Sequence, residues 1–412
     1  MDLLSSLARR AVGSGLARLR HGRLVVRDGA DARSFGDPGV AALEIVVRDP
    51  RFYRAVAFGG AVGAGEAYAE GWWTTDDLTG VGRLLLRNRA SLERLETGWA
   101  RLAQPLRRVT HALNRNTRRG SRRNIGAHYD LGNEFFRTFL DDTLTYSCGL
   151  FERSGATLRD ASIAKYERIC ALIDLRPEDH VIEIGTGWGG FALHAASRYG
   201  CRVTTTTISE EQFALASKRV IDAGLADRVT VLRRDYRDLD GSYDKLVSIE
   251  MIEAVGHEHF ATFFAQCARL LMPDGRAAIQ AITIEDSRYD AARREVDFIK
   301  RHIFPGCCIP SLVVLLQAAS RADLRLERTD EIGPHYAETL RRWRSNLASS
   351  RDRLAGRFDD RFQRMWEFYF CYCEGGFEER AIGTVQMVFA KPASQLGATR
   401  RVSAVPALVS AA

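Results

Sequence analysis

The stretch EIGTGWGG at residues 183–190 decides the fold, because it is a glycine loop between an expected strand and an expected helix. Glycines let the backbone turn sharply and approach a ligand closely, and the following helix offers free N–H groups. Strands are expected at residues 180–184, 201–208, 229–232, 245–249 and 277–284, and helices at 191–199 and 210–223. This alternation predicts a doubly wound α/β sheet.

The loop also satisfies the GxGxxG pattern of dinucleotide sites through Gly185, Gly187 and Gly190. A dehydrogenase usually carries an acid at the end of the second strand, where it binds the ribose. Here residues 204–209 read TTTTIS, without an acid. Glu183 lies two residues before the first glycine, as in S-adenosylmethionine (SAM) sites, where an acid lies near the methionine moiety. We therefore expect SAM rather than NAD.

Length and composition fit a globular protein with one large domain and a smaller one, since the 412 residues are 46% hydrophobic and 27% charged. No apolar run reaches 18 residues, and no signal peptide is evident at the N-terminus. The eight cysteines form neither a CxxC pair nor zinc-finger spacing with histidines. We expect a reduced, cytoplasmic protein without a structural metal.

Residues 1–100 are expected to form a small α+β domain. Residues 1–20 have the pattern of a basic amphipathic helix, which could lie on a membrane or pack on its own domain. Residues 43–47 alternate as a half-buried strand. The glycines and paired tryptophans between Gly65 and Trp73 predict a turn with an aromatic anchor.

The net charge of +7 is concentrated before the glycine loop, because residues 97–129 contain eight arginines and no acid. Residues 101–123 are therefore expected to be an arginine-rich linker to a catalytic domain at 124–391, with a loose tail at 392–412. A solvated linker, contact with anionic lipid head groups and contact with nucleic acid phosphates all remain open. A nucleic acid methyltransferase would need a base-flipping motif, and none is evident.

Long motifs surround the loop on both sides. They are GAHYDLGNEFF at 126–136, TYSCGLF at 145–151, TISEEQ at 207–212, EMIEAVG at 250–256, FIKRHIFPG at 298–306 and CEGGF at 373–377. With these motifs the chain resembles the cyclopropane-fatty-acyl-phospholipid synthase family, including its mycolic-acid-modifying relatives, over residues 65–391. The resemblance implies a Rossmann-like SAM-dependent methyltransferase fold with a seven-stranded sheet.

The resemblance also implies methyl transfer from SAM to a cis double bond of a phospholipid acyl chain. The SAM contacts that it implies are Tyr129, Tyr146, Ser147, Gly185, Gly187, Thr207, Gln212, Tyr236 and Arg237. Asp235, after the third strand, is a further candidate on the adenine side. The unsaturated phospholipid would be met at the inner face of the membrane, with residues 1–100 docked there. Many family members are homodimers, and the sequence leaves the oligomeric state open.

An alkene is a weak nucleophile, so its attack on the sulfonium methyl depends on positioning. The attack leaves a carbocation, and ring closure then removes a proton from the transferred methyl. Family members are understood to hold bicarbonate as the base. The resemblance assigns it to the side chains of Cys148, Glu253 and Tyr336 and to the backbone of Ile282. Cys373 matches a family candidate for a nucleophile, although this chemistry needs no covalent intermediate.

Gln280 departs from the family pattern, because typical members carry a histidine there as a further bicarbonate ligand. An amide can donate a hydrogen bond, but it cannot carry a charge or relay a proton. The cation could instead undergo a hydride shift and lose a proton to give an exocyclic methylene group. A separate flavin-dependent reductase would then be the partner that makes a methyl branch. Cyclopropane is the first expectation, and the methylene or methyl-branched chain is the alternative.

Overall fold

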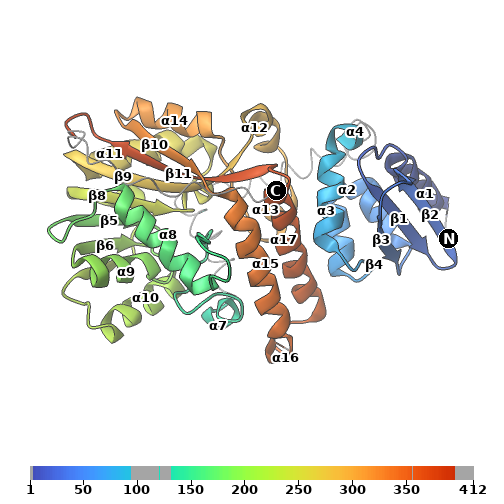
Figure 1. The fold of residues 1–412 in the computed structure, drawn as a ribbon, viewed down its shortest axis with the longest axis horizontal. Coiled ribbons are helices and arrows are strands. Elements are labelled where there is room, and N and C mark those ends of the chain that lie inside the picture. The colour runs from blue at the N-terminus through green and yellow to red at the C-terminus, as the bar shows by residue number, and fades with distance from the viewer. Residues whose placement is uncertain (1–2, 94–119, 121–130, 355, 395–412) are drawn as a thin grey trace.

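A computed structural model of the chain describes residues 3–93, 120, 131–354 and 356–394 (Figure 1). These residues form a small domain on a four-stranded sheet, at the right of the view, and a larger domain on a seven-stranded sheet. The two sheets confirm the predicted α/β fold with a smaller N-terminal α+β domain. Except for residue 120, the expected arginine-rich linker at 101–123 lies outside the described residues, as does the tail beyond residue 394.

The N-terminal domain contains the expected local elements. In chain order its elements are α1 (Leu3–Leu16), β1 (Arg23–Asp28), β2 (Asp31–Gly36), β3 (Ala42–Val47), α2 (Arg51–Ala69), β4 (Trp73–Thr74), α3 (Leu78–Arg87) and α4 (Arg89–Glu93). The sheet order is β2-β1-β3-β4, with β1 and β3 parallel. Helix α1 is the expected basic helix, and β3 is the expected half-buried strand, with Ile45 and Val47 buried.

The turn expected between Gly65 and Trp73 begins later than predicted. Helix α2 continues through Ala69, and the chain turns at Gly71, which has a φ of 73°. Gly65 lies inside the helix and allows a close approach to the larger domain, because a Cβ there would lie 2.5 Å from the Phe298 ring. Trp73 is the expected aromatic anchor and is buried.

The larger domain alternates strands and helices. Its first half contains α7 (Asn133–Phe136), α8 (Leu158–Leu172), β5 (His180–Ile184), α9 (Gly190–Tyr199), β6 (Arg202–Thr206), α10 (Glu210–Asp222), β7 (Val229–Leu232), η1 (Tyr236–Asp238) and β8 (Tyr243–Ile249). Its second half contains η2 (Ile252–Ala254), η3 (His257–His259), α11 (Phe260–Leu270), β9 (Leu271–Ile284), α12 (Asp286–Ala292), α13 (Phe298–His302), α14 (Leu312–Arg321), β10 (Arg325–Glu331), α15 (Gly333–Ser349), α16 (Arg351–Leu354), α17 (Asp360–Glu378) and β11 (Ile382–Ala390).

The strand order is β10-β11-β9-β8-β5-β6-β7. Strands β5 to β9 run parallel, and β11 is antiparallel to β9 and to β10. The chain builds outward from β5 to β7 and then returns to β8 on the other side of β5. Ligands bind such sheets at the carboxyl ends of the strands beside this switch point.

Both faces of the parallel sheet are buried. Along β5, Val181 belongs to the apolar core with α8 and α9, whereas Ile182 belongs to the core with α11 and α14. Val247 and Leu246 of β8 divide between the same two cores. Strands buried on both faces read as continuous apolar runs, which is why these strands could be predicted.

Two details of the sheet are not evident from the local sequence. Residues 273–275, Pro-Asp-Gly, lie inside β9, where the pairing with β8 shifts between Leu271 and Arg276. Strands β10 and β11 were not located individually. Strand β10 reads RLERTDE and is largely exposed, so it shows no alternation of apolar and polar residues.

The two domains meet through α17, which packs on α15 and on helices α2 and α3 of the N-terminal domain (Figure 1). The Tyr68 hydroxyl of α2 donates to the Glu367 carboxylate of α17 at 3.0 Å. The Thr79 hydroxyl of α3 donates to Glu374 at 3.2 Å. Helix α17 therefore connects the N-terminal domain to the large cavity described next.

Candidate active site

The carboxyl ends of β5, β6, β8 and β9 border a cavity of about 1160 Å³. Eleven of the twelve residues predicted to contact SAM line it: Tyr146, Ser147, Glu183, Gly185, Gly187, Gly190, Thr207, Gln212, Asp235, Tyr236 and Arg237. The twelfth, Tyr129, lies outside the described residues. The part lined by these residues is called the cofactor end below.

The glycine loop forms the floor of the cofactor end. It follows β5 directly, and Gly185 and Gly187 have φ values of 107° and 52°, which favour glycine. A Cβ at Gly187 would meet nothing within 4 Å, so the loop leaves room for a ligand beside it. At Gly190, where α9 begins, a Cβ would lie 2.5 Å from the Tyr166 hydroxyl. This glycine is needed for packing.

Hydroxyl and amide groups take the place of an acid after β6. The Thr207 hydroxyl donates to Gln212 Oε1 at 2.8 Å, so the Gln212 amide is held in place. Glu183 is 2% exposed and accepts a 2.6 Å hydrogen bond from the Thr205 hydroxyl. Burial raises the pKa of Glu183 to about 8. These groups give the cofactor end few formal charges.

Asp235 is bound by a neighbour. Arg237 donates from Nε to Oδ1 at 2.8 Å and from Nη2 to Oδ2 at 2.6 Å, which is a bidentate ion pair. The Arg237 guanidinium also lies 5.5 Å from the centroid of the Tyr236 ring. The ion pair and the ring contact hold Asp235, Tyr236 and Arg237, three consecutive predicted SAM contacts, together in the lining of the cavity.

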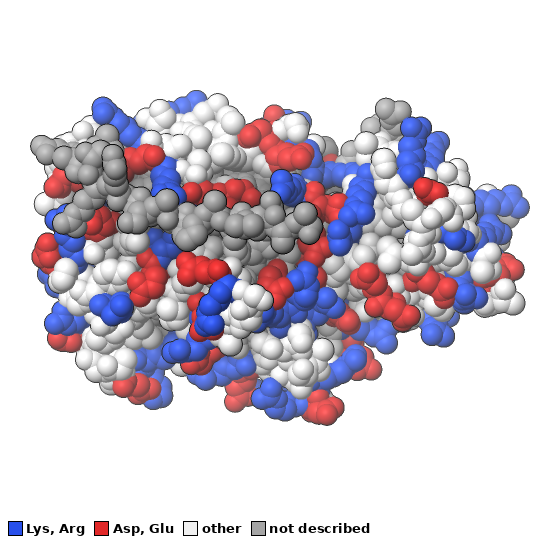
Figure 2. Space-filling view, viewed as in Figure 1, with Lys and Arg blue, Asp and Glu red and all other residues white. Residues whose placement is uncertain are grey.

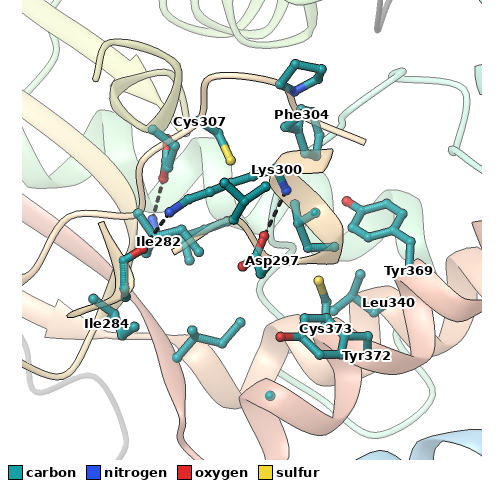
Figure 3. A pocket seen from close by; sticks show the side chains of 18 of the residues that line it. Ile282, Ile284, Asp297, Lys300, Phe304, Cys307, Leu340, Tyr369, Tyr372 and Cys373 are labelled. Atoms are coloured by element: carbon teal, nitrogen blue, oxygen red, sulfur yellow. Dashed lines mark hydrogen bonds between the residues drawn. The ribbon is translucent and has the colours of Figure 1, made fainter. Parts of the chain in front are cut away.

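The opposite part of the cavity is lined by Glu250, Glu253, Ile282 and Tyr336, and is called the reaction end below. Figure 3 shows the side chains beside the reaction end. Most of those that it labels are apolar or aromatic, namely Ile282, Ile284, Phe304, Cys307, Leu340, Tyr369, Tyr372 and Cys373, and Asp297 and Lys300 are charged. An apolar wall of this kind suits a hydrocarbon chain and excludes water.

Glu250 joins three of the predicted catalytic residues. Its Oε1 accepts from the Cys148 backbone N–H at 3.0 Å and from the Gln280 amide at 2.8 Å. Its Oε2 accepts from the Tyr336 hydroxyl at 2.6 Å. Burial raises the pKa of Glu250, while the hydrogen bond from Tyr336 acts in the opposite direction. Of the groups predicted to bind a bicarbonate ion, the Gln280 amide and the Tyr336 hydroxyl are thus bound to a protein carboxylate, and Cys148 reaches it through its backbone N–H rather than its thiol.

Glu253 has one satisfied oxygen. Its Oε1 accepts from the Ile282 backbone N–H at 2.5 Å, so these two candidate site residues lie in contact. Its Oε2 is buried and has no hydrogen-bond partner among the residues that the structure describes. Burial, followed by the nearby charge of Glu250, raises the pKa of Glu253 to about 8. Because Glu253 lines the cavity, this oxygen is available for a hydrogen bond with a ligand.

The two cysteines predicted in the site are thiols with raised pKa values. Cys148 is fully buried, and its Sγ donates to the carbonyls of Gly149 and Ile332. Burial raises the pKa of Cys148 and of Cys373. A thiolate is the nucleophilic form, so these surroundings disfavour a nucleophilic cysteine. Cys148 contributes its backbone N–H, and Cys373 contributes to the cavity wall.

Aromatic side chains near the cavity belong partly to the core. Phe135 and Trp366 are buried with ring centroids 4.7 Å apart, and Phe139 is also buried. On α17, Tyr369 lines the cavity. The Tyr336 ring stacks on Phe377 at 4.5 Å, which fixes the direction of its hydroxyl.

The residues fit SAM and bicarbonate differently. The cofactor end has room beside Gly187, exposed backbone and the Thr207–Gln212 pair, which fits the adenosyl and methionine parts of SAM. An anion at the reaction end would need the donors of Cys148, Gln280 and Tyr336, and Glu250 already occupies them. SAM therefore fits the site, whereas a bicarbonate ion would have to compete with Glu250 for these donors.

Sequence reasoning missed Glu250. It stands three residues before Glu253 in the EMIEAVG motif, directly after β8, so two acids at the carboxyl edge of the sheet were a visible signal. Its φ of 49° was not predictable. This left-handed backbone at a non-glycine residue is typical of functional sites.

Comparisons with known proteins agree with this geometry. Residues 116–387 match the family model described as mycolic acid cyclopropane synthetase. The chain is 38% identical over 373 residues to the tuberculostearic acid methyltransferase UfaA1 of Mycobacterium tuberculosis, covering 88% of this chain and 86% of that protein. It is 35% identical over 356 residues to the cyclopropane-fatty-acyl-phospholipid synthase of Escherichia coli, covering 86% and 89%.

A solved structure of a relative supports the same conclusion. The mycolic acid cyclopropane synthase CmaA1, complexed with SAH and CTAB, superposes with a TM-score of 0.60 at 30% identity, covering 66% of this chain and 98% of that one. Both sequence relatives are matched over most of their length. The chain therefore belongs to the mycolic acid cyclopropane synthetase family and is a SAM-dependent C-methyltransferase that modifies fatty acyl chains.

Proposed function

We propose that the chain transfers a methyl group from SAM to the cis double bond of an unsaturated acyl chain in a membrane phospholipid. The observation that carries this proposal is a carboxylate, Glu250, held by three donors on the wall of a cavity that also contains the glycine loop. Such a cavity brings an acyl chain and a methyl donor together away from water, so positioning supplies much of the catalysis.

The reaction leaves a cation on the acyl chain and needs one base. In ring closure, the transferred methyl loses a proton and its C–H electrons form the bond to the cationic carbon. In the alternative, a hydride moves from the methyl-bearing carbon to the cation, and the methyl then loses a proton to form an exocyclic C=CH2 group. Both outcomes release one proton near the reaction end.

Glu250 is the group proposed to take this proton in place of bicarbonate. Its carboxylate already accepts from the Tyr336 hydroxyl, the Gln280 amide and the Cys148 backbone N–H, at 2.6 to 3.0 Å. Burial raises its pKa, which makes the ionised carboxylate a stronger base. The three donors hold it in one orientation, so it also cannot swing freely toward the cation.

The site favours the methylene product, which a separate flavin-dependent reductase would convert to a methyl branch. Gln280 and Glu250 form a hydrogen-bonded pair at the place where the family pattern has a histidine. The 38% identity with a tuberculostearic acid methyltransferase supports the same choice. Cyclopropane remains the second candidate, because Glu253 and Ile282 keep the family arrangement and the chain is 35% identical to a cyclopropane synthase.

The N-terminal domain is proposed to dock on the inner face of the membrane. Leu4 and Leu7 of α1 are 54% and 52% exposed, and Arg10 lies on the same short basic helix. No helix among the described residues is long and apolar enough to span a bilayer. Figure 2 shows basic and acidic side chains interspersed on the face in view, so the apolar side chains of α1 carry the docking proposal.

The test uses the full chain, unsaturated phospholipid vesicles and methyl-labelled SAM, with the fatty acids identified by mass spectrometry. We expect label in a methylene-branched chain, which becomes methyl-branched when a flavin-dependent reductase is added. Label in a cyclopropane ring would select the second candidate. Absence of label from every fatty acid would overturn the proposed reaction. Vesicle sedimentation of a Leu4→Glu, Leu7→Glu double variant tests docking, which should weaken.

A further inference from the structure

Lys165 is a buried cation without a place in the chemistry described so far. It lies in the middle of α8, whose first turn is fixed by a capping box between Thr157 and Asp160. Its side chain is fully buried. Burying an ammonium group is costly unless it is paired, so a lysine here needs a reason.

Among the described residues, the Lys165 ammonium group makes one hydrogen bond. It donates to Ser147 Oγ at 2.5 Å, and it lies 4.7 Å from the centroid of the Tyr166 ring. An ammonium has three N–H donors, and among the described residues no ion pair joins Lys165 to a carboxylate. Burial lowers its pKa to about 8, although the charges of Glu250 and Glu183 act in the opposite direction.

The contact determines the direction of the Ser147 hydroxyl. Because the serine oxygen accepts a hydrogen bond from Lys165, its own O–H must point away from the lysine. Ser147 lines the cavity beside the glycine loop, and α8 lies behind it. A hydroxyl polarised by an ammonium is also a stronger donor than a free one. The cavity therefore receives an oriented donor with a positive charge behind it.

Such a donor recognises an anion. SAM carries one anionic group, the carboxylate of its methionine moiety. The carboxylates named above at the cofactor end have other partners, since Glu183 accepts from Thr205 and Asp235 is paired with Arg237. We infer that Lys165 is a positioning residue that binds the methionine carboxylate of SAM indirectly, by orienting and polarising the hydroxyl of Ser147. The inference depends on the proposed placement of SAM at the cofactor end.

The test compares two ligands that differ only in this carboxylate, S-adenosylhomocysteine and decarboxylated S-adenosylhomocysteine. Their affinities are measured by calorimetry for the wild type, Lys165→Met, Ser147→Ala and the double variant. We expect each single variant to bind S-adenosylhomocysteine roughly 10- to 100-fold more weakly, the usual loss for a charge-assisted hydrogen bond. Binding of the decarboxylated ligand should change less than about 3-fold. The double variant should be no weaker than the single ones, since both act through one contact.

The controls separate this role from a structural one. Lys218→Met removes an exposed lysine that pairs with Asp222 on α10, and it should leave both affinities unchanged. Equal weakening of both ligands by Lys165→Met, or no weakening of either, would overturn the inference. If that variant does not fold, Ser147→Ala must still discriminate between the ligands. A wild-type chain that binds neither ligand would refute the proposed SAM site instead.

Discussion

Some polar pairs at the cofactor end of the cavity are close in the sequence, whereas the partners of Glu250 at the reaction end come from distant segments. Thr207 and Gln212 are five residues apart, and Asp235 and Arg237 are two apart. At the reaction end, Glu250 is 102 residues from Cys148, 30 from Gln280 and 86 from Tyr336. The cofactor end is thus a set of local motifs, and the reaction end exists only when β8, β9 and α15 are packed together.

The difference has a consequence for catalysis. A local motif depends little on how the rest of the site is packed, which suits a part that binds the methyl donor. The long-range cluster around Glu250 is desolvated and mutually dependent, so loss of one partner leaves a buried charge unsatisfied. Substitutions at the reaction end should therefore change turnover, and those at the cofactor end should change binding.

Glu250→Gln should have the largest effect. The amide keeps the shape of the side chain but cannot take a proton, so turnover should fall by about 10³-fold. S-Adenosylhomocysteine should still bind with wild-type affinity, because the cofactor end is intact. Transfer of labelled methyl to fatty acid and calorimetry measure the two quantities. Glu178→Gln, at an exposed carboxylate, is the matched control. Full turnover in Glu250→Gln would refute the assignment of the base.

Tyr336→Phe should have the second-largest effect on turnover. It removes the 2.6 Å hydrogen bond to Glu250 and keeps the ring that stacks on Phe377. A hydrogen bond to a charged group contributes about 1.5–3 kcal/mol, so kcat should fall roughly 10- to 100-fold with an unchanged KM for SAM. Tyr199→Phe removes a similar bond to Glu167, far from the cavity, and should be silent. A change confined to KM would contradict the division between the two ends.

Gly185→Ala tests the cofactor end. The residue has a φ of 107°, and a Cβ would lie 3.1 Å from Met251, so the loop must shift. Strain of this kind costs about 1–3 kcal/mol, and we expect affinity for S-adenosylhomocysteine to fall about 10-fold or more. The ratio of products at saturating SAM should not change. Gly224→Ala has a similar left-handed backbone with open space around it, and it should affect stability without affecting ligand binding.

Glu183→Gln should have the smallest effect on activity, and its main effect should be on stability. Burial raises the pKa of Glu183 to about 8. Between the unfolded pKa of about 4.3 and this value the unfolded chain binds fewer protons, so the free energy of unfolding falls as pH rises. The variant should gain stability relative to wild type by up to about 1.4 kcal/mol per pH unit between about pH 5 and pH 8. Urea denaturation measures this, and a difference independent of pH would contradict it.

The local signals were sufficient for most of the sheet and for the cofactor end. Strands such as β5 are buried on both faces, so their apolar runs were visible in the sequence. The glycine loop was recognisable because Gly185 and Gly187 need left-handed backbone. Strand β10 escaped because its exposed, charged residues resemble a loop. Prediction thus succeeded where the physical constraint acts within a few residues.

The sequence alone indicated the α/β class, the use of SAM and the candidate site residues Cys148, Glu253, Gln280 and Tyr336. Only the tertiary structure decided that Glu250 is the common partner of Cys148, Gln280 and Tyr336, and that Lys165 lies behind Ser147. The reason is that hydrogen bonds between segments tens of residues apart depend on how helices pack on the sheet. That packing is a property of the whole chain, and no local pattern encodes it.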